Sequence, residues 1–189
     1  MNDRLPPADK TLLLKCARDA IINGLRGEPY PFADLSIYPE RLRKPGATFI
    51  TLKINSKLRG CVGALDATLP LVQDVQEHAL AAALQDHRFP PLSLSELQET
   101  EIEISILTHP VQIQYENPDD LLNQIHPYVD GVTLKDGHNR ATFLPQVWEK
   151  IPSPEMFIST LCRKMGAAPD LWLVKTLDVF TYQVEKFHE

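Results

Sequence analysis

The densest group of residues that could carry chemistry is the segment Leu58-Arg59-Gly60-Cys61-Val62-Gly63. Two glycines flank the cysteine and leave the backbone open, so that a ligand could approach the amide and the sulfur of Cys61. A nearby guanidinium favours the thiolate, which is the nucleophilic form of a cysteine side chain. The segment therefore predicts a reactive Cys61, with Arg59 as its electrostatic partner or as an anion clamp. The alternative interpretation is a bulged strand that contains a buried cysteine.

Three polar residues elsewhere could act together with this cysteine. His87 precedes Arg88 in a proline-rich segment and could serve as the base for Cys61 if the fold brings the two together; otherwise it is a surface loop histidine. Glu103 and Ser105 alternate with isoleucines in a predicted strand, so they either line a polar cleft or face water. The 6 histidines show no HxH, HxxxH or HExxH spacing, and we therefore expect no zinc site.

Charge is distributed unevenly along the chain. The formal net charge is −6, yet residues 41–65 contain no acid and six basic side chains. This stretch could present a basic patch to a phosphate or a carboxylate, or it could be a solvated sheet edge on which lysines deter aggregation. Nucleic-acid binding is disfavoured, because the whole chain is acidic and the basic stretch lacks an aromatic stacking platform.

The length and composition are those of one globular domain. The chain has 189 residues, of which 43% are hydrophobic and 23% charged, and the prolines (16) outnumber the glycines (8). Three cysteines cannot all pair in internal disulfides, which favours reduced thiols. The first residues lack the apolar core of a secretory signal, and no apolar run approaches the ~20 residues of a membrane helix. We therefore expect a cytosolic protein that does not enter the membrane.

Hydrophobic spacing and turn residues predict the elements that position these candidates. Helices are expected over residues 8–26, 69–85, 118–125 and 154–165, and strands over residues 47–54, 58–65, 101–107, 131–135 and 140–144. Thr68 is the expected N-cap of the second helix, and Cys16 falls on the apolar stripe of the first. The remaining segments are a proline-punctuated connection over residues 28–46, a helical turn over 145–150 and an extended segment over 173–187. Helices and hairpins alternate without a regular βαβ rhythm, which predicts an α+β domain with an antiparallel or mixed sheet.

The sequence around Cys61 resembles the AMMECR family, which is named for the Alport syndrome and elliptocytosis chromosomal region and is called AmmeMemoRadiSam system protein A in bacteria. Four blocks carry the resemblance, in order along the chain. They are Thr48-Phe49-Ile50-Thr51-Leu52 with residues 58–63, Asp86-His87-Arg88-Phe89-Pro90-Pro91-Leu92, Ile102–Thr108 with Pro110, and Gly131-Val132 with residues 140–147. In the second block His87 replaces the family's usual proline, so His87 is not carried over as a functional residue.

The resemblance covers essentially the whole chain and implies a single domain over residues 1–189. It implies an α+β fold in two unequal lobes, with the Arg-Gly-Cys segment near a cleft between them. The candidate ligand-binding residues lie in the same four blocks and are Gly60, Gly63, Thr51, Arg88, Phe89, Ser105, Phe143, Pro145 and Gln146. Bacterial relatives are encoded with a Memo-like protein, similar to non-haem iron dioxygenases, and with a radical S-adenosylmethionine protein, which are therefore the expected partners.

Three functions stay open at this point. The first is a component of an enzyme system, in which Cys61, Arg59 and Glu103 are the candidate catalytic residues and a small anionic ligand binds the cleft. Glu103 would be its acid or base. The second is a non-catalytic adaptor that binds a protein partner, with the Arg-Gly-Cys segment as a structural bulge. The third, which the net charge disfavours, is a nucleic-acid binder. The sequence leaves any cofactor unknown and indicates no metal-binding residues.

Overall fold

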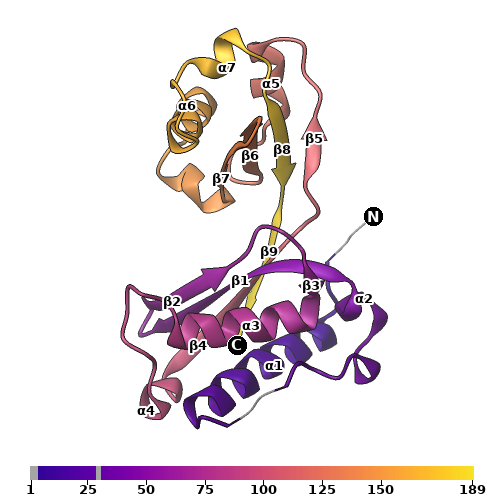
Figure 1. Ribbon diagram of the computed structural model, residues 1–189, viewed down its shortest axis with the longest axis vertical. Coiled ribbons are helices and arrows are strands. Elements are labelled where there is room, and N and C mark those ends of the chain that lie inside the picture. The colour runs from indigo at the N-terminus through magenta and orange to yellow at the C-terminus, as the bar shows by residue number, and fades with distance from the viewer. Residues whose placement is uncertain (1–3, 29–30) are drawn as a thin grey trace. The chain divides into compact units, whose positions relative to one another are not determined.

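The fold is that of a computed structural model, which describes residues 4–28 and 31–189 (Figure 1). Residues 1–3, in the segment without a signal core, and residues 29–30, in the connection expected over residues 28–46, lie outside the described residues. The chain divides into two units. The first contains the chain up to Leu107 together with Glu185–Glu189, and the second is Thr108–Val184.

Helix α1, Pro7–Leu25, is the first element of the first unit, and the sequence predicted it within one residue at each end. Pro7 suits the first helical position because its missing N–H would have no partner there. The chain leaves the helix through Gly27, whose φ of +66° favours glycine. Apolar residues at spacings of three and four are buried on one face, and Cys16 is among them, as predicted.

The sheet of the first unit has the strand order β2-β1-β4-β9, and β1 pairs antiparallel with both β2 and β4. Its strands are β1 (Pro45–Ile54), β2 (Lys57–Gly63), β4 (Thr100–Leu107) and β9 (Val184–His188), with a short strand β3 (Leu69–Pro70) against the start of β1. The turn from β1 to β2 consists of Asn55 and Ser56, which both have the positive φ that a two-residue hairpin turn requires. The strands predicted over residues 47–54, 58–65 and 101–107 are confirmed, with shifted ends.

Helix α3, Leu71–Leu84, lies with α1 on one face of this sheet (Figure 1). Its predicted apolar stripe is confirmed, since the buried residues include Val72, Val75, Ala79 and Ala82. The prediction of Thr68 as its N-cap is wrong, because the helix starts only after Pro70 and no side chain caps it. Leu69 and Pro70 are held in β3 against the start of β1, and this pairing prevents an earlier helix start.

Three short helices of the first unit were not predicted. They are η1 (Leu35–Ile37), α2 (Glu40–Arg43) and α4 (Leu94–Leu97). Helices of this length show no helical period in the sequence, and local capping stabilises them instead. Asp34 accepts a hydrogen bond from the amide of Ser36 before η1, and Ser93 forms a capping box with Glu96 at α4. The connection expected over residues 28–46 is therefore partly helical.

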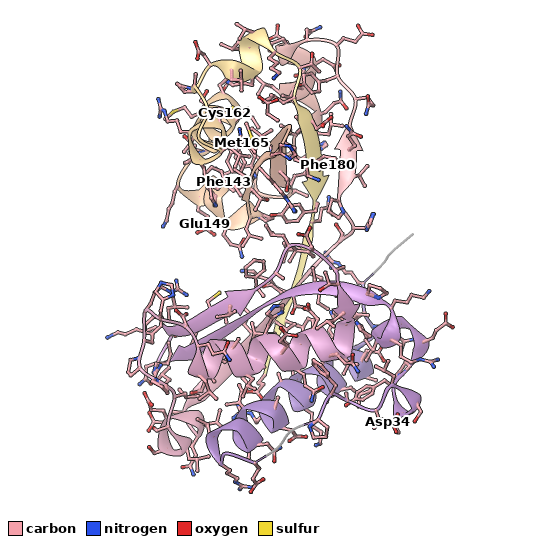
Figure 2. The ribbon with its side chains drawn as sticks, viewed as in Figure 1. Asp34, Phe143, Glu149, Cys162, Met165 and Phe180 are labelled. Atoms are coloured by element: carbon pink, nitrogen blue, oxygen red, sulfur yellow. The ribbon has the colours of Figure 1, made fainter. Side chains whose placement is uncertain are left out.

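The second unit contains an antiparallel sheet of order β5-β8-β6-β7. Its elements are β5 (Val111–Ile113), α5 (Pro118–Gln124), β6 (Gly131–Asp136), β7 (Asn139–Phe143), η2 (Pro145–Glu149), α6 (Pro154–Lys164), α7 (Leu171–Val174) and β8 (Asp178–Tyr182). The helices expected over residues 118–125 and 154–165, the hairpin and the helical turn are confirmed. Cys162 and Met165 at α6 (Figure 2) are buried in a core that includes the stacked rings of Trp148 and Phe157, whose centroids are 3.6 Å apart.

The expectation of an extended segment over residues 173–187 is wrong in its first part. Helix α7 continues to Val174, and the strand β8 begins only at Asp178. The run Leu171-Trp172-Leu173-Val174 is apolar throughout, so it has no period that distinguishes a helical turn from a strand. The indole of Trp172 favours the helix, because it is buried and its Nε1 donates a hydrogen bond to Ser159 in α6. Strand β5 was missed because its three residues are too few to show alternation.

The architecture confirms an α+β fold with antiparallel sheets. The three cysteines remain thiols, which agrees with the prediction from their odd number. Within the described residues, no helix is both long enough and apolar enough to cross a bilayer.

Candidate functional site

Cys61 lies in β2 beside an irregularity of the sheet. The pairing of β2 with β1 changes register between Leu52 and Lys53, and this change leaves Arg59 as an extra residue of β2. An extra residue in one strand is a β-bulge, and it re-aims the side chains around it. The bulged strand that the glycines indicated is therefore present, but the cysteine in it is only partly buried.

The two glycines beside Cys61 are required by packing. A Cβ at Gly60 would stand 2.2 Å from the backbone oxygen of Ala82 in α3. A Cβ at Gly63 would stand 2.3 Å from the backbone oxygen of Thr48 in β1. The close approach that these glycines permit is thus made by the protein's own backbone, and ligand approach is not needed to explain either of them.

Cys61 shares a row across the sheet with two other predicted site residues. Thr51 of β1 lies opposite Cys61 on one side and opposite Glu103 of β4 on the other. Residues directly opposite one another in a sheet point to the same face. We call this face the cysteine face, and its row is Cys61, Thr51 and Glu103. The neighbouring residues Leu52 and Ile102 point to the other face, where they are buried with α1 and α3 in the helix-covered core.

The backbone and the sulfur of Cys61 are both held by neighbouring side chains. The Thr51 hydroxyl donates a hydrogen bond to the sulfur over 3.4 Å. The Cys61 amide donates to the Asp86 carboxylate over 2.8 Å, and the Arg88 guanidinium donates to the Cys61 carbonyl over 3.1 Å. Residues from β1 and from the loop after α3 therefore fix Cys61, while it stays partly exposed.

Asp86 and Arg88 form a tight ion pair behind the cysteine. Arg88 donates through Nε and Nη2 to the two oxygens of Asp86, over 2.9 and 2.6 Å. The Arg88 side chain, with the amide of Cys61 assisting, holds the pKa of the Asp86 carboxyl far below its usual range in spite of burial. The pKa of Arg88 is raised, mainly by Asp86 and to a smaller extent by the Cys61 side chain. The Arg88 guanidinium thus holds both the Asp86 carboxylate and the backbone carbonyl of Cys61.

Arg59 does not take the place that the sequence suggested. Its guanidinium donates to Glu96 through Nε over 2.9 Å and through Nη2 over 3.2 Å. The hydrogen bonds from Arg59, together with the Ser93 amide, lower the pKa of Glu96 to about 2. Arg59 thus fastens α4 to the bulge of β2, and the cation beside Cys61 is Arg88. Spacing along the chain could not separate the two arginines, because the bulge and the loop after α3 decide where each guanidinium points.

Phe89 lies close to both arginines. Its ring centroid is 6.0 Å from the guanidinium carbon of Arg59 and 5.6 Å from that of Arg88, distances at which a cation is attracted to an aromatic ring. His87, in contrast, is exposed, and no hydrogen bond in the described part of the chain joins it to Cys61. The hypothesis that His87 is the base for Cys61 therefore finds no support in the geometry.

Glu103 is bound by two lysines. Lys53 donates to one carboxylate oxygen over 2.9 Å, and Lys186 lies 3.5 Å from the other. Burial opposes the ionisation of Glu103, but the hydrogen bond from Lys53 and the charge of Lys186 outweigh it, so its pKa is lowered. A carboxyl that keeps its charge is a weak proton donor, so Glu103 suits the positioning of cations better than acid catalysis. Ser105 in the same strand is buried and does not face water.

The other three predicted ligand-binding residues belong to the second unit. Phe143 (Figure 2) meets Phe157 edge to face, with 5.2 Å between the ring centroids, and Lys164 lies 5.0 Å from the centroid of the Phe143 ring. Pro145 is the first residue of η2. The side-chain Oε1 of Gln146 is buried without a hydrogen-bond partner in the described part of the chain. A ligand-binding role for these residues stays a prediction.

Most of the basic side chains over residues 41–65 are paired with acids. The ion pairs are Arg41 with Asp9, Lys44 with Glu40, Lys53 with Glu103 and Arg59 with Glu96. All four acids lie outside the stretch, which is why the sequence of the stretch alone suggested an open basic patch. The nucleic-acid hypothesis thereby loses the feature that motivated it. Among the described residues, no cluster of three or more histidine, cysteine or acidic side chains could hold a metal ion.

Comparison with known proteins shows which family the chain belongs to. The AMMECR1 family model matches residues 14–187, which include all four blocks around and beyond Cys61. The chain belongs to the AMMECR1 family. The resemblance drawn from the Arg-Gly-Cys segment is therefore confirmed.

Archaeal members of the AMMECR1 family match nearly the whole chain. Protein MJ0810 of Methanocaldococcus jannaschii is 33% identical over 186 residues, which cover 95% of this chain and 89% of the relative. A protein of Methanothermobacter thermautotrophicus is 35% identical over 182 residues, which cover 94% of this chain and 92% of the relative. The crystal structure of the uncharacterized protein PH0010 from Pyrococcus horikoshii is similar with a TM-score of 0.79 and 31% identity, over 94% of this chain and 90% of that one.

Proposed function

We propose that this AMMECR1-family protein is a component of an enzyme system, in which Cys61 is a reactive thiol and a small anionic ligand binds beside it. The observation that carries the proposal is a partly exposed Cys61, whose sulfur accepts a hydrogen bond from Thr51 and whose carbonyl accepts one from the Arg88 guanidinium. A cation beside a sulfur favours the thiolate, and the thiolate is the form that acts as a nucleophile.

Arg88 also supports the anionic character of the ligand. Its side chain is 47% exposed, and its hydrogen bonds to Asp86 and Cys61 use Nε and Nη2. A guanidinium has five N–H donors in a planar fork, and within the described residues Nη1 makes no hydrogen bond, so its donors remain for a carboxylate or a phosphate. An anion bound there would lie next to the thiol of Cys61.

Each residue of this site has a distinct part. Cys61 supplies the nucleophile, Thr51 fixes its sulfur, and Arg88 supplies the positive charge. Asp86 is a positioning residue, because it accepts both from the Cys61 amide and from the Arg88 guanidinium. This set replaces the sequence-based hypothesis of a catalytic Arg59 and keeps its central thiol.

Alkylation of the native protein tests the thiol directly. Iodoacetamide at neutral pH forms a thioether as the sulfur displaces iodide, and mass spectrometry locates the product. We expect Cys61 to react faster than free cysteine under the same conditions. Cys16 and Cys162, which are 3% and 0% exposed, should stay protected and serve as internal controls. If Cys61 reacts no faster than free cysteine, the proposed reactive thiol is refuted.

A matched pair of arginine variants tests the part of Arg88. Both Arg88 and Arg59 are paired with a carboxylate and lie near Phe89, but of the two, within the described residues, only Arg88 donates a hydrogen bond to Cys61. Arg88→Gln should slow alkylation of Cys61 several-fold and should weaken protection of Cys61 by added phosphate. Arg59→Gln should leave both measurements unchanged. Equal effects of the two substitutions would contradict the assignment.

The proposal extends to partners and location, for which the family resemblance is the support. We propose that the protein acts in the cytosol with a Memo-like protein and a radical S-adenosylmethionine protein. The alternative is a non-catalytic adaptor, in which the loop around Arg88 is a docking surface. Purified proteins should form a complex in a pull-down. An adaptor would keep its function in cells after Cys61→Ala and lose the complex after Arg88→Glu, whereas an enzyme component would lose its function after Cys61→Ala.

A further inference from the structure

A hollow lies on the first unit, on the opposite side of the sheet from Cys61. It has a volume of about 420 Å³, and its walls include Val62 of β2, His78 and Leu80 of α3, and Phe32 of the connection before η1. Val62 follows Cys61 directly in β2, and successive strand residues point to opposite faces. The hollow is therefore separate from the proposed thiol site. Its volume falls within the ~300–1,000 Å³ that is usual for small-molecule sites.

One polar side chain of the hollow is fixed from behind. His78 is 8% exposed, and its Nδ1 lies 3.1 Å from Oδ2 of Asp74. The same oxygen accepts a hydrogen bond from the buried Thr48 hydroxyl over 2.6 Å. Nδ1 is thus occupied, and Nε2 has no hydrogen-bond partner within the described residues. Nε2 is therefore the ring nitrogen that the hollow offers to a ligand.

The aromatic wall of the hollow is also held in place. Phe32 is 55% exposed, but both of its flanking residues are bonded to α3. The side-chain amide of Gln76 accepts from the Ala33 amide over 2.7 Å and donates to the Pro31 carbonyl over 3.0 Å. Gln73 adds a hydrogen bond to the Ala33 carbonyl. A large exposed ring on an anchored segment is a preformed wall, which lowers the ordering cost of binding.

The charges around the hollow select against an anion. Glu77 lines the hollow, and the carboxylate of Asp74 lies behind His78. Burial opposes a charged His78 ring, but the hydrogen bond and charge of Asp74, with Glu77, raise its pKa above the ordinary value. A ligand hydroxyl suits the ring in either protonation state, because it can donate to a neutral Nε2 or accept from a protonated one.

We propose that this hollow is a binding site for an uncharged small molecule with an aromatic or apolar body and one hydroxyl group. The body packs against Phe32, Val62 and Leu80, and the hydroxyl bonds to Nε2 of His78. This ligand differs in charge from the anion proposed at Cys61, so the two sites are distinguishable.

Titration with 4-methylphenol tests the site. In the full-length protein with ¹⁵N-labelled histidine, long-range ¹H–¹⁵N spectra resolve the two ring nitrogens of each histidine. We expect 4-methylphenol to shift the Nε2 signal of His78 saturably and to leave the exposed His87 and His138 unmoved. Toluene should bind roughly five- to tenfold more weakly, since it lacks the hydrogen bond, and 4-methylbenzoate should also be weaker because of Glu77.

A matched pair of variants tests the aromatic wall without touching the buried histidine. Phe32→Ala should weaken 4-methylphenol binding severalfold. Ile37→Ala removes a side chain of the nearby helix η1 that is 74% exposed and does not line the hollow, and it should leave binding unchanged. The proposal is overturned if His78 shows no saturable shift, if toluene binds as well as 4-methylphenol, or if the two variants bind alike.

Discussion

The two faces of the sheet in the first unit use alternate residues of the same strands in different ways. On the helix-covered face, Ile50 and Leu52 of β1 have no exposed surface and pack with α1 and α3. On the cysteine face, Thr51 and Lys53 of the same strand bind Cys61 and Glu103 and stay partly exposed. Apolar burial dominates the stability of such a unit. The helix-covered face therefore contributes most of the stability, and the cysteine face is available for chemistry.

Truncation of the helix-covered face should have the largest effect on stability. Ile104→Ala removes a fully buried side chain of β4 and should lower the free energy of unfolding by about 2–5 kcal/mol. Cys61→Ala on the cysteine face should change it by less than ~1 kcal/mol. Urea unfolding should be followed by circular dichroism, to which the long helices α1 and α3 contribute most, because the indole fluorescence comes from the second unit, which contains Trp148 and Trp172. Equal losses in the two variants would contradict the division between the faces.

A substitution at the bulge should have the second-largest effect on the free energy of unfolding, because the added side chain would collide with the helix that covers the sheet. In Gly60→Ala the new Cβ would meet the Ala82 carbonyl of α3, which cannot move without shifting the helix. We expect a loss of about 2 kcal/mol, typical of an overpacked core. Leu58→Ala, in the same strand at a half-exposed position, is the control and should cost much less. A stable Gly60→Ala protein would show that α3 does not need this close approach.

The sequence predicted the helix-covered face well, because burial leaves a periodic signal. The spacing in α1 and α3 and the alternation in β4 identified the buried residues, including Cys16. Elements that are fixed by single contacts left no such signal. The start of α3 depends on the pairing of β3 with β1, and α7 depends on the burial of Trp172. Neither contact is visible along the chain.

The site was predictable in its residues but not in their pairing. The Arg-Gly-Cys segment identified Cys61, and the second block of the resemblance included Arg88 and Phe89. The bulge at Arg59 then takes that guanidinium away from Cys61, since Arg59 turns to Glu96 and Arg88 takes the place expected for it. The sequence did not single out His78 as a site residue, because its partner Asp74 lies one helical turn away among apolar residues. Such a pair reads in sequence as part of an ordinary helix.

Removal of the charge at Asp86 should have an intermediate effect and should connect stability with the cysteine face. Asp86→Asn keeps the shape but weakens the bonds to the Cys61 amide and to Arg88, and we expect a loss of about 1–2 kcal/mol near neutral pH. The pKa of Asp86 is depressed in the folded protein, so its contribution is present above the unfolded pKa of about 3.9 and is lost as the pH falls through the folded pKa. The unfolding free energies of wild type and Asp86→Asn should therefore converge in strong acid. A difference that persists there would show that the charge is not the cause.

The smallest effect is expected at the ion pair of Arg59 and Glu96. This pair tests whether α4 influences the reactivity of Cys61. The Glu96 side chain is 38% exposed, and pairs of this kind contribute less than about 1 kcal/mol. The variants Arg59→Gln, Glu96→Gln and the double variant form a cycle, whose coupling free energy from urea unfolding should lie between about 0.2 and 1 kcal/mol. The alkylation rate of Cys61 should be the same in all three, since the pair holds α4 and not the thiol. A change in the alkylation rate would mean that α4 affects the thiol of Cys61. Arg59 would then belong to the thiol site, as the sequence suggested.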